Sequence, residues 1–381
     1  MSTMAYLEWF FWLSILGVAY AYIGYPIALL IWARLRPVGL QATVPVPDEI
    51  SIVLPVHNEI GNIRARLDNL LSIDVPEGGA EIIVVSDNST DGTTEVAREY
   101  ALRHEAIHVL ELPSRGGKAG ALNAGASLAK GPIVIFTDAS ITLEQGSLLQ
   151  LLQPFSDPKV GCVSGEDFVR GGGGESTYSR YEFFLRRAES AVGSIVGASG
   201  SFYGQRRDLV PHFFPDIAPD LLSVLHTVER GYRAISEPGA VGYLGAVPSR
   251  GDEFQRKVRT VIRGMAGVFR YKALLNPFRS GRFAWILGSH KIIRWLVPVF
   301  LATALATSAV LSSQSAYAYF FTIQLVGYAF GGVGLVSPVR LVPGRLGKLA
   351  SFFLLSNAAI AFAWLRFAAG HRISVWSPSR R

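Results

Sequence analysis

The chain has 381 residues, 50% of them apolar and 17% charged, and its 36 Lys and Arg against 29 Asp and Glu give a net charge of +7. The usual charged share is about 25%, and these proportions exclude a disordered chain, a coiled coil and a collagen-like repeat. A single cysteine, Cys162, excludes a disulfide framework and a cysteine-based metal site. The length suits two or three ordinary domains, or one domain plus a membrane section.

The first feature in chain order is the uncharged run Trp9–Trp32. A helix of that length reaches roughly 36 Å, enough to span a bilayer core of about 30 Å. Ala19–Ala21 resembles a signal-peptide cleavage box, but Glu8 precedes the run where a signal peptide carries Lys or Arg. We therefore expect residues 1–36 to be a retained anchor, with the arginines that follow the run on the cytoplasmic side.

Residues 37–250 have ordinary polarity and alternate short apolar runs with helical patterns. The runs that read as buried strands are Ile52–Pro55, Ile82–Ser86, Val109–Leu112 and Ile133–Thr137. This alternation predicts an α/β domain with a mostly parallel, Rossmann-like sheet. Ligands of such sheets bind at the carboxyl ends of the strands.

Polar residues gather where each of these strands ends. The segments are Pro55–Glu59, Asp87–Thr93, Arg115–Asn123 and Thr137–Ser140. Because the carboxyl ends of parallel strands share one edge of the sheet, we expect the four segments to converge there. Each segment alone is also ordinary turn or helix-cap chemistry, so the prediction depends on all four together.

The residue types at this edge suit a nucleoside diphosphate. Carboxylates at Asp87 and Asp91 accept hydrogen bonds from a base or a ribose. Backbone amides of Gly116–Gly117, with Lys118 at a helix start, suit a diphosphate. Asp138 suits a divalent cation that bridges phosphate oxygens.

Motifs of other enzyme classes fail here. Pro113 stands where a Walker loop needs its first Gly, and no G-x-G-x-x-G follows the first strand. His104–His108 matches the zinc motif H-E-x-x-H, which requires both histidines on one helical face. Strand-like residues follow at once, so we expect the helix to end near His104 and exclude a metalloprotease.

Three further apolar runs lie near Leu296–Leu311, Tyr317–Val336 and Leu349–Leu365. Backbone polar groups need partners in lipid, so these runs should be helices. They predict a C-terminal membrane section over 296–366 and a basic tail over 367–381. Four crossings would place the tail outside, whereas its arginines favour the inside. One run is then re-entrant or interfacial, and the sequence leaves open which.

Residues 251–295, between the domain and this section, predict amphipathic interfacial helices. Apolar residues recur at helical spacing at Phe254, Val258, Val261, Met265 and Val268. Gln255 and Arg259 would face the active site, or the basic face would contact anionic lipid. Lys291–Trp295 is a second interfacial candidate.

The strand-end segments, in this order, resemble family 2 glycosyltransferases with a GT-A fold. The membrane-embedded branch, similar to cellulose, chitin and hyaluronan synthases, matches best. Asp216–Asp220 falls where that branch has its general-base Asp. Gln255–Thr260 falls where it has Q-x-x-R-W, and Val375–Arg380 resembles its Trp-plus-Arg ending.

Three residues depart from the family pattern. Ser140 replaces the second Asp of D-x-D, Pro219 precedes Asp220 where an acidic residue is usual, and Thr260 replaces the Trp of Q-x-x-R-W. The last two weaken the expectation that the enzyme holds a growing polymer.

The resemblance implies a role for each matched residue. Asp220 would be the catalytic base, Asp138 with Ser140 would hold Mg or Mn, and Gly200 and Ser201 would lie on the acceptor side. The residues implied in nucleotide-sugar binding are Pro55, His57, Asn58, Glu59, Asp87, Asp91, Lys118, Asn123, Asp138, Gln255 and Arg259.

The implied protein is an inverting hexosyl- or N-acetylhexosaminyl-transferase of the plasma (inner) membrane, multi-pass, with a cytoplasmic catalytic domain. Its partners would be a nucleotide-sugar donor, above all a UDP-sugar, membrane lipid, and a polysaccharide or lipid-linked acceptor. One alternative is a ceramide-type transferase with a simple lipid acceptor. Another is a non-catalytic nucleotide-binding membrane protein. Nucleic acid is not expected, because the basic residues cluster beside apolar runs.

Overall fold

The computed structural model describes residues 2–169, 174–245, 250–336 and 345–371. The predicted ending Val375–Arg380 lies outside these residues, as does most of the predicted basic tail. The strands are β1 Ile50–Val56, β2 Ala80–Ser86, β3 Ile107–Glu111, β4 Ile133–Thr137, β5 Ile141–Leu143, β6 Val160–Val169, β7 Phe202–Arg206 and β8 Arg233–Leu244.

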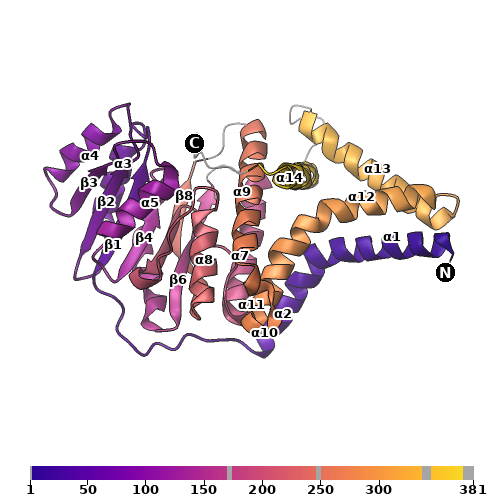
Figure 1. The fold of residues 1–381 in the computed structure, drawn as a ribbon, viewed down its shortest axis with the longest axis horizontal. Helices are drawn as coiled ribbons and strands as arrows, with labels where there is room; N and C mark the ends of the chain where they lie inside the picture. The colour runs from indigo at the N-terminus through magenta and orange to yellow at the C-terminus, as the bar shows by residue number, and fades with distance from the viewer. Residues whose placement is uncertain (1, 170–173, 246–249, 337–344, 372–381) are drawn as a thin grey trace.

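Helices cover the sheet and extend beyond it (Figure 1). Those of the first half are α1 Thr3–Ala19, η1 Tyr20–Gly24, α2 Tyr25–Leu35, α3 Ile63–Ser72, α4 Thr93–Ala101, α5 Gly117–Leu128, α6 Ser147–Leu152, η2 Gln153–Ser156 and α7 Gly174–Val192. Those of the second half are η3 Arg207–Leu209, α8 Pro219–Glu229, α9 Arg250–Arg270, η4 Lys272–Leu275, α10 Pro277–Ser280, α11 Arg282–Leu287, η5 Gly288–Ile293, α12 Arg294–Val310, α13 Ser315–Val336 and α14 Arg345–Ala368.

The strands form one eight-stranded sheet in the order β3-β2-β1-β4-β7-β6-β8-β5. The pairs from β3 to β4 are parallel, as predicted, and β1 is buried along its whole length. The third strand begins at Ile107, earlier than the predicted Val109. The other half is mixed, because β7 runs antiparallel to both of its neighbours and β5 runs antiparallel to β8. The α/β fold is confirmed.

Each face of the sheet buries its own core. One core packs α3, α4 and α6 against the sheet. The other packs α5, α7 and α8 on the opposite face and continues without a break into α9, α11 and α2, where it includes Tyr25 and Leu29. On that face α5 lies close to β1, and a Cβ at Gly125 would come within 2.4 Å of Val53. The apolar helices therefore share a core with the sheet domain.

Within the described residues, four segments are long and apolar enough to cross a membrane, namely 3–35, 282–310, 315–335 and 346–368. All four predicted apolar runs are thus helical. The second segment differs from the prediction, since one continuous helix runs through α11, η5 and α12 and starts well before Leu296. Lys291–Trp295, predicted as interfacial, lies inside that helix.

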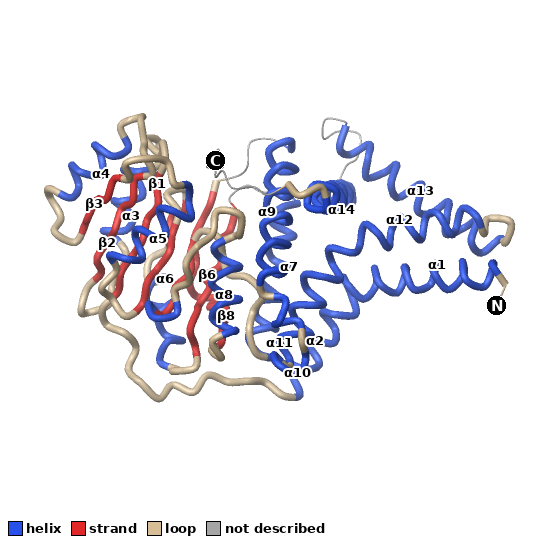
Figure 2. Tube along the Cα trace, viewed as in Figure 1, coloured by secondary structure: helices blue, strands red, loops and turns tan. Residues whose placement is uncertain are grey.

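The long helices are not all aligned (Figures 1 and 2). Helices α1 and α12 pack side by side and lead away from the sheet, and Gly17 meets the ring of Phe300. The N-terminus and the turn between α12 and α13 lie at the far end of this arm. In the same view α14 is seen end-on, so it crosses α1 and α12 steeply and lies nearer the sheet domain.

Helix α9 confirms the predicted periodicity but not its expected partner. Val258 and Ile262 pack against Ala359 and Ala363 of α14, while Met265 belongs to the main core. The apolar face expected to rest on lipid therefore packs largely against protein. Periodicity identifies a buried face but does not identify what covers it.

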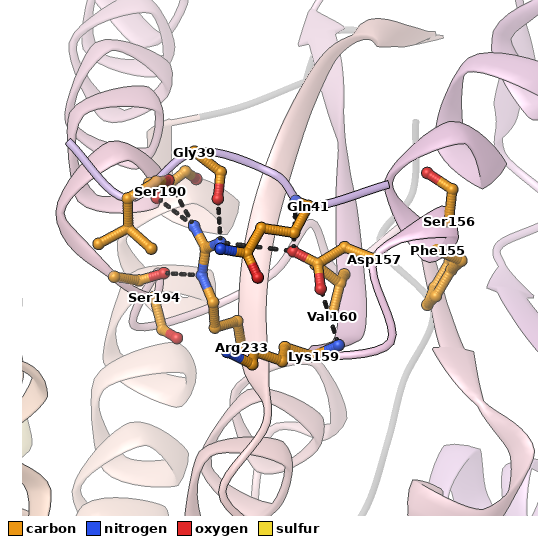
Figure 3. A network of polar contacts seen from close by, with 12 residues as sticks. Gly39, Gln41, Phe155, Ser156, Asp157, Lys159, Val160, Ser190, Ser194 and Arg233 are labelled. Carbon is orange, nitrogen blue, oxygen red and sulfur yellow. Dashed lines mark hydrogen bonds and ion pairs between the residues drawn. The ribbon is translucent and has the colours of Figure 1, made fainter. Parts of the chain in front are cut away.

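The segment that joins α2 to β1 is fixed to the sheet domain (Figure 3). The Arg233 guanidinium donates hydrogen bonds to the carbonyls of Val38 and Gly39, both at 3.1 Å, and to that of Ser190 at 2.9 Å. The backbone N–H of Gln41 donates to Asp157 at 3.0 Å. These contacts hold the exit of the first apolar helix against the domain.

Candidate active site

The turns after β1 and β2 are bonded to each other. The His57 ring nitrogen Nδ1 donates to the Asp87 carbonyl at 2.7 Å, and the Asn58 side-chain oxygen accepts from the N–H of Thr90 at 2.9 Å. Asn58 and Asn88 both have a positive φ, of 53° and 55°. Asn tolerates this left-handed conformation better than most residues. Two of the four predicted segments thus meet, and Pro55 lies in β1 directly before them.

Asp87 is completely buried and uses both carboxylate oxygens within the protein. One oxygen accepts the N–H of Gly116 at 2.6 Å, and the other accepts that of Gly117 at 2.9 Å. We predicted these two amides as diphosphate donors, but in this structure Asp87 takes both. Asp87 therefore positions the loop at the start of α5 and, with it, Lys118.

Lys118 and Asp138 form the centre of this edge. Lys118 Nζ lies 2.5 Å from Asp138 Oδ1 and 3.1 Å from the Gly200 carbonyl oxygen, and the Asp138 N–H donates to the Ser201 carbonyl at 3.1 Å. Ser140, also partly buried, follows two positions after Asp138. Residues predicted for diphosphate, metal and acceptor binding therefore lie together. We call Asp87, Lys118 and Asp138 the donor edge.

Asp91 and Glu59 lie beside the donor edge but differ in their bonding. Asp91 accepts hydrogen bonds from Thr93 and from the N–H of Ile60. Although burial raises its pKa, these hydrogen bonds bring the pKa of Asp91 below its usual value. Burial raises the pKa of Glu59, and the negative charge of Asp138 adds to this effect. Asp91 thus has the ordinary turn-and-cap role that was the alternative to nucleotide binding.

Two predicted nucleotide-binding residues have other surroundings. The Asn123 side-chain amide donates to the Phe213 carbonyl at 3.0 Å and accepts the Phe213 N–H at 2.8 Å, so it clasps a loop. Gln255 is exposed on α9. Arg259, on the same helix, is partly buried, yet neither it nor Gln255 lines the cavity described next.

A cavity of about 350 Å³ separates the sheet domain from the apolar helices. It is lined by residues of α7, α8, α9, η5, α12 and α14 and of the segment that contains Gly197 and Ala198. We call it the helix-side cavity. Helix α9 contributes Arg256, Lys257 and Thr260 to the lining. These residues are adjacent in sequence to Gln255 and Arg259, which were predicted to face the site.

Asp220 lines the helix-side cavity from the first turn of α8. The N-cap of that helix is Ala218, and no side chain caps it, so Asp220 is not the helix cap that was its ordinary alternative. The Arg263 guanidinium donates to the Ile217 carbonyl at 2.8 Å, which ties α9 to this turn. Burial lowers the pKa of Arg263, while the charges of Asp220 and Asp216 oppose that shift.

Tyr203 connects the two regions. This buried residue of β7 has a pKa raised well above its usual value by burial; a hydrogen bond from Ser223 opposes the shift, and the charges of Asp220 and Asp138 add to it. The Gly200 carbonyl accepts from Lys118 at the donor edge, and Gly197 and Ala198, just before it in the chain, line the cavity. The donor edge and the helix-side cavity adjoin each other through β7.

The sequence reading missed a charged network between α7 and the apolar helices. Glu182 pairs with Arg294 at 2.7 Å and with His290 at 3.1 Å, and His290 also lies 2.5 Å from Glu189. Burial would raise the pKa of Glu182, but Arg294 and His290 hold it well below its usual value. Allowing isolated charges within an apolar run would have extended the second run back to these residues.

The donor edge offers a divalent cation only a small number of protein ligands. No group of three or more His, Cys, Asp or Glu suited to a metal occurs in the part of the chain that the structure describes. Mg²⁺ commonly uses one or two carboxylates and takes its other ligands from water and substrate phosphates. The Asp138 carboxylate and the Ser140 hydroxyl match that oxygen chemistry.

The mixed α/β sheet with acidic strand ends, with long apolar helices before and after it in the sequence, is a GT-A fold. Residues 51–214 match the model of the family described as glycosyl transferase family 2. This segment of the chain is therefore similar to that family. The matched segment includes the donor edge and ends before Asp220.

Similar proteins include synthases and a solved transferase. The chain is 29% identical over 244 residues to poly-beta-1,6-N-acetyl-D-glucosamine synthase of Staphylococcus epidermidis, covering 61% of this chain and 57% of that protein. It is 32% identical over 126 residues to beta-monoglucosyldiacylglycerol synthase of a Nostoc species, covering 32% of this chain and 26% of that protein. The match thus spans little more than half of the first relative.

A solved structure extends the likeness to nearly the whole chain. The mannosyltransferase PcManGT from Pyrobaculum calidifontis, in complex with GDP-Man and Mn²⁺, superposes with a TM-score of 0.74 at 26% identity. The match covers 96% of this chain and 100% of that one. The apolar helices outside the family model are therefore part of the shared fold.

Proposed function

We propose that this protein moves a sugar from a nucleotide-sugar to a polysaccharide or lipid-linked saccharide at the membrane. The observation that carries the proposal is the placement of the Lys118–Asp138 pair beside Gly200, next to a cavity that holds Asp220. A donor diphosphate at the first place and an acceptor hydroxyl at the second would adjoin each other. The match of residues 51–214 to the family 2 model supports this reading.

The donor would occupy the ends of β1, β2 and β4. The turns around His57 and Asp87 would frame the base, and Lys118 would leave Asp138 to contact the diphosphate. We propose a UDP-sugar as the donor. GDP-sugars belong in the same test, because the similar mannosyltransferase was solved with GDP-Man.

Asp138, with Ser140, would hold Mg²⁺ or Mn²⁺, and the solved mannosyltransferase contains Mn²⁺. A bound ion of this kind neutralises negative charge that develops on the leaving diphosphate. Of the protein's own groups, Lys118 supplies positive charge at the same place. The carboxylate of Asp138 thus orients Lys118 in this structure. When the donor is bound, Lys118 would contact the diphosphate.

Asp220 would act as the general base. Its carboxylate accepts the proton of the acceptor hydroxyl, whose oxygen then forms a bond to the anomeric carbon. The bond from that carbon to the diphosphate oxygen breaks, and the nucleotide leaves with the electron pair. Attack opposite the leaving group inverts the anomeric configuration. General-base catalysis typically contributes about 10²–10⁴-fold in rate.

We propose three membrane crossings and a cytoplasmic catalytic domain in the plasma (inner) membrane, and the arrangement of the helices supports the number of crossings. Helices α1 and α12 lead away from the sheet, whereas α14 crosses them steeply beside it (Figure 1). We propose that α14 lies along the membrane surface although its composition would allow a span. The C-terminus then lies on the side of the catalytic domain, as the basic tail favours.

The test of function uses membranes that contain the full chain, a panel of labelled UDP- and GDP-sugars, and Mn²⁺. Products are sorted by size and by lipid solubility, with Asp220→Asn as the control. Transfer that the control lacks supports the proposal, and a long product ladder favours polymerisation despite Thr260. A lipid-soluble product of one sugar favours a simple lipid acceptor. No transfer from any donor would refute the proposed function.

A further inference from the structure

The helix-side cavity has a composition that the sugar-transfer reaction alone does not explain. Its charged lining comprises five cations, Arg186, Arg256, Lys257, Lys291 and Arg294, and three carboxylates, Asp167, Glu182 and Asp220. Arg256 and Lys257 have interactions of their own, which leaves Arg186, Lys291 and Arg294 to consider. An uncompensated charge in a poorly solvated place is costly, and a bound anion removes that cost.

Internal pairing removes one of these cations from consideration. Arg294 bonds to Glu182 at 2.7 Å and to the Tyr178 hydroxyl at 3.0 Å. Glu182 also pairs with His290. Asp220 is needed as a base for the acceptor hydroxyl. The charges of Glu182 and Glu189 also act on Lys291, but neither carboxylate forms a hydrogen bond or an ion pair with it in the described part of the chain.

Lys291 is the cation with the fewest partners at hand. It forms no hydrogen bond or ion pair with any residue in the parts of the chain described above. Its ammonium lies 3.8 Å from the place that a Cβ on Gly197 would take. It therefore borders the small-residue segment that precedes Gly200 and Ser201, which we predicted to lie on the acceptor side.

Arg186 adds a second donor at the same place. Its Nη2 bonds to the Ala198 carbonyl at 3.3 Å, whereas its Nη1 is buried and has no hydrogen-bond partner among the described residues. Arg186 and Lys291 both line the cavity on the side of Gly197 and Ala198. An unpaired guanidinium nitrogen beside an unpaired ammonium is suited to a phosphate.

The backbone at Lys291 is unusual as well. Lys291 lies in the π-helical segment η5. This segment is part of the long helix 282–310, which could cross a membrane. Such segments are rare and occur frequently at functional sites. Ionisable residues within membrane segments are costly and commonly serve function. Apolar groups from Trp295, Phe352 and Ile360 also line the cavity and suit an apolar chain.

We propose that Lys291 and Arg186 bind the phosphate of a lipid-linked acceptor, whose hydrocarbon chain leaves along α12 and α14. The acceptor hydroxyl would then reach Asp220 in the same cavity. This inference names the acceptor class and rests on the proposed function. Replacing one charge-assisted contact typically weakens binding by about tenfold or more.

The experiment uses the full chain in lipid nanodiscs and three probes, namely a polyprenyl phosphate, the matching polyprenol and inorganic phosphate. Affinity is measured by equilibrium titration for the wild type and for Lys291→Met, Lys291→Arg and Arg186→Met. Lys272→Met, at an exposed lysine far along the chain in η4, is the matched control. Binding of a nucleotide-sugar is measured on the same samples.

We expect the wild type to prefer the polyprenyl phosphate over the polyprenol by tenfold or more. Lys291→Met and Arg186→Met should each lose about tenfold of that preference, Lys291→Arg should restore most of it, and Lys272→Met should leave it unchanged. Nucleotide-sugar affinity should stay within twofold throughout. Because donor binding is measured separately, the loss of donor binding in the wild type would count against the proposed function and not against this site.

Three results would overturn the inference. Equal affinity for the phosphate and the alcohol would remove the phosphate from recognition. If Lys291→Met loses affinity equally for inorganic phosphate and polyprenyl phosphate, and the wild type shows no preference for the lipid, the site binds free phosphate. A tenfold weaker nucleotide-sugar affinity in Lys291→Met would assign the cation to the donor instead.

Discussion

The donor edge and the helix-side cavity treat charge in opposite ways. At the donor edge both Asp87 oxygens accept backbone amides, and Lys118 pairs with Asp138. In the cavity, Lys291 and one nitrogen of Arg186 remain without such partners. The donor edge is held in shape by hydrogen bonds among its own residues. When the donor binds, Lys118 must exchange its contact with Asp138 for one with the donor. The helix-side cavity is supported by packing and by the Glu182 network, and the proposed phosphate would give Lys291 and Arg186 a partner.

The largest expected effect tests the network that supports the cavity. Glu182→Gln removes the carboxylate that pairs with Arg294 and leaves His290 with Glu189 alone. Breaking a buried pair in this way typically costs about 3–5 kcal/mol. Thermal unfolding of the purified chain measures the loss. Glu99→Gln, which breaks the exposed Arg64–Glu99 pair at 3.1 Å, is the control and should cost less than about 1 kcal/mol.

The same comparison has a pH dependence with a defined sign. The pKa of Glu182 in the folded chain lies well below its usual value, so the carboxylate stabilises the fold above the unfolded pKa of about 4.3. That stabilisation is lost as the pH falls through the folded pKa. The stability gap between wild type and Glu182→Gln should therefore narrow in acid. A gap that widens in acid would contradict the network as described.

The next effect tests the donor edge. Asp138→Asn removes the carboxylate that orients Lys118 and would hold the cation, and we expect kcat/KM for the donor to fall by about 100-fold. Asp91→Asn is the matched control, because its carboxylate bonds to Thr93 in its own turn and to Ile60 in the turn after β1. A smaller loss for Asp138→Asn than for Asp91→Asn would reverse the two assignments.

A smaller effect tests whether Asn123 binds the donor. Asn123→Ala removes the clasp on Phe213 and leaves two backbone groups without partners, at a cost of about 1–3 kcal/mol in stability. The KM for the donor should stay within twofold. An increase of the donor KM at unchanged stability would return Asn123 to the nucleotide site.

The smallest effect concerns Gln255, which the family pattern places near the donor. Because its side chain is exposed on α9, Gln255→Ala should change stability by less than about 0.5 kcal/mol and leave the donor KM unchanged. Steady-state kinetics with the preferred nucleotide-sugar decides this. A tenfold rise in KM would show that α9 rotates or shifts when the donor binds.

The strand half of the fold could be predicted because its signals are local. Each apolar run of the parallel strands ends in polar residues, and parallel strands bring those ends together without further information. Lys118 and Asp138 therefore meet at this edge as expected. Gly200, which precedes the antiparallel β7, was not part of that expectation. The pairing of Asp87 with the Gly116 and Gly117 amides could not be predicted, because those groups suit either a ligand or each other equally well.

The helix half resisted prediction because its contacts are distant in sequence. The apolar stripe of α9 is the same whether lipid or α14 covers it, and only the fold shows Val258 against Ala359. Likewise Glu182 and Arg294 are 112 positions apart, so no spacing rule links them. The charges upstream of Leu296 looked interfacial because their partners on α7 were not visible in the sequence.

The most direct test of the central claim measures donor binding and sugar transfer together in Asp220→Asn. The account separates a donor edge from a cavity that holds the base, so the variant should bind the nucleotide-sugar within twofold of the wild-type affinity while transfer falls by about 10²–10⁴-fold. Equilibrium titration and product counting on the same preparation give both values. Full transfer by the variant, or loss of donor binding in parallel with transfer, would contradict it.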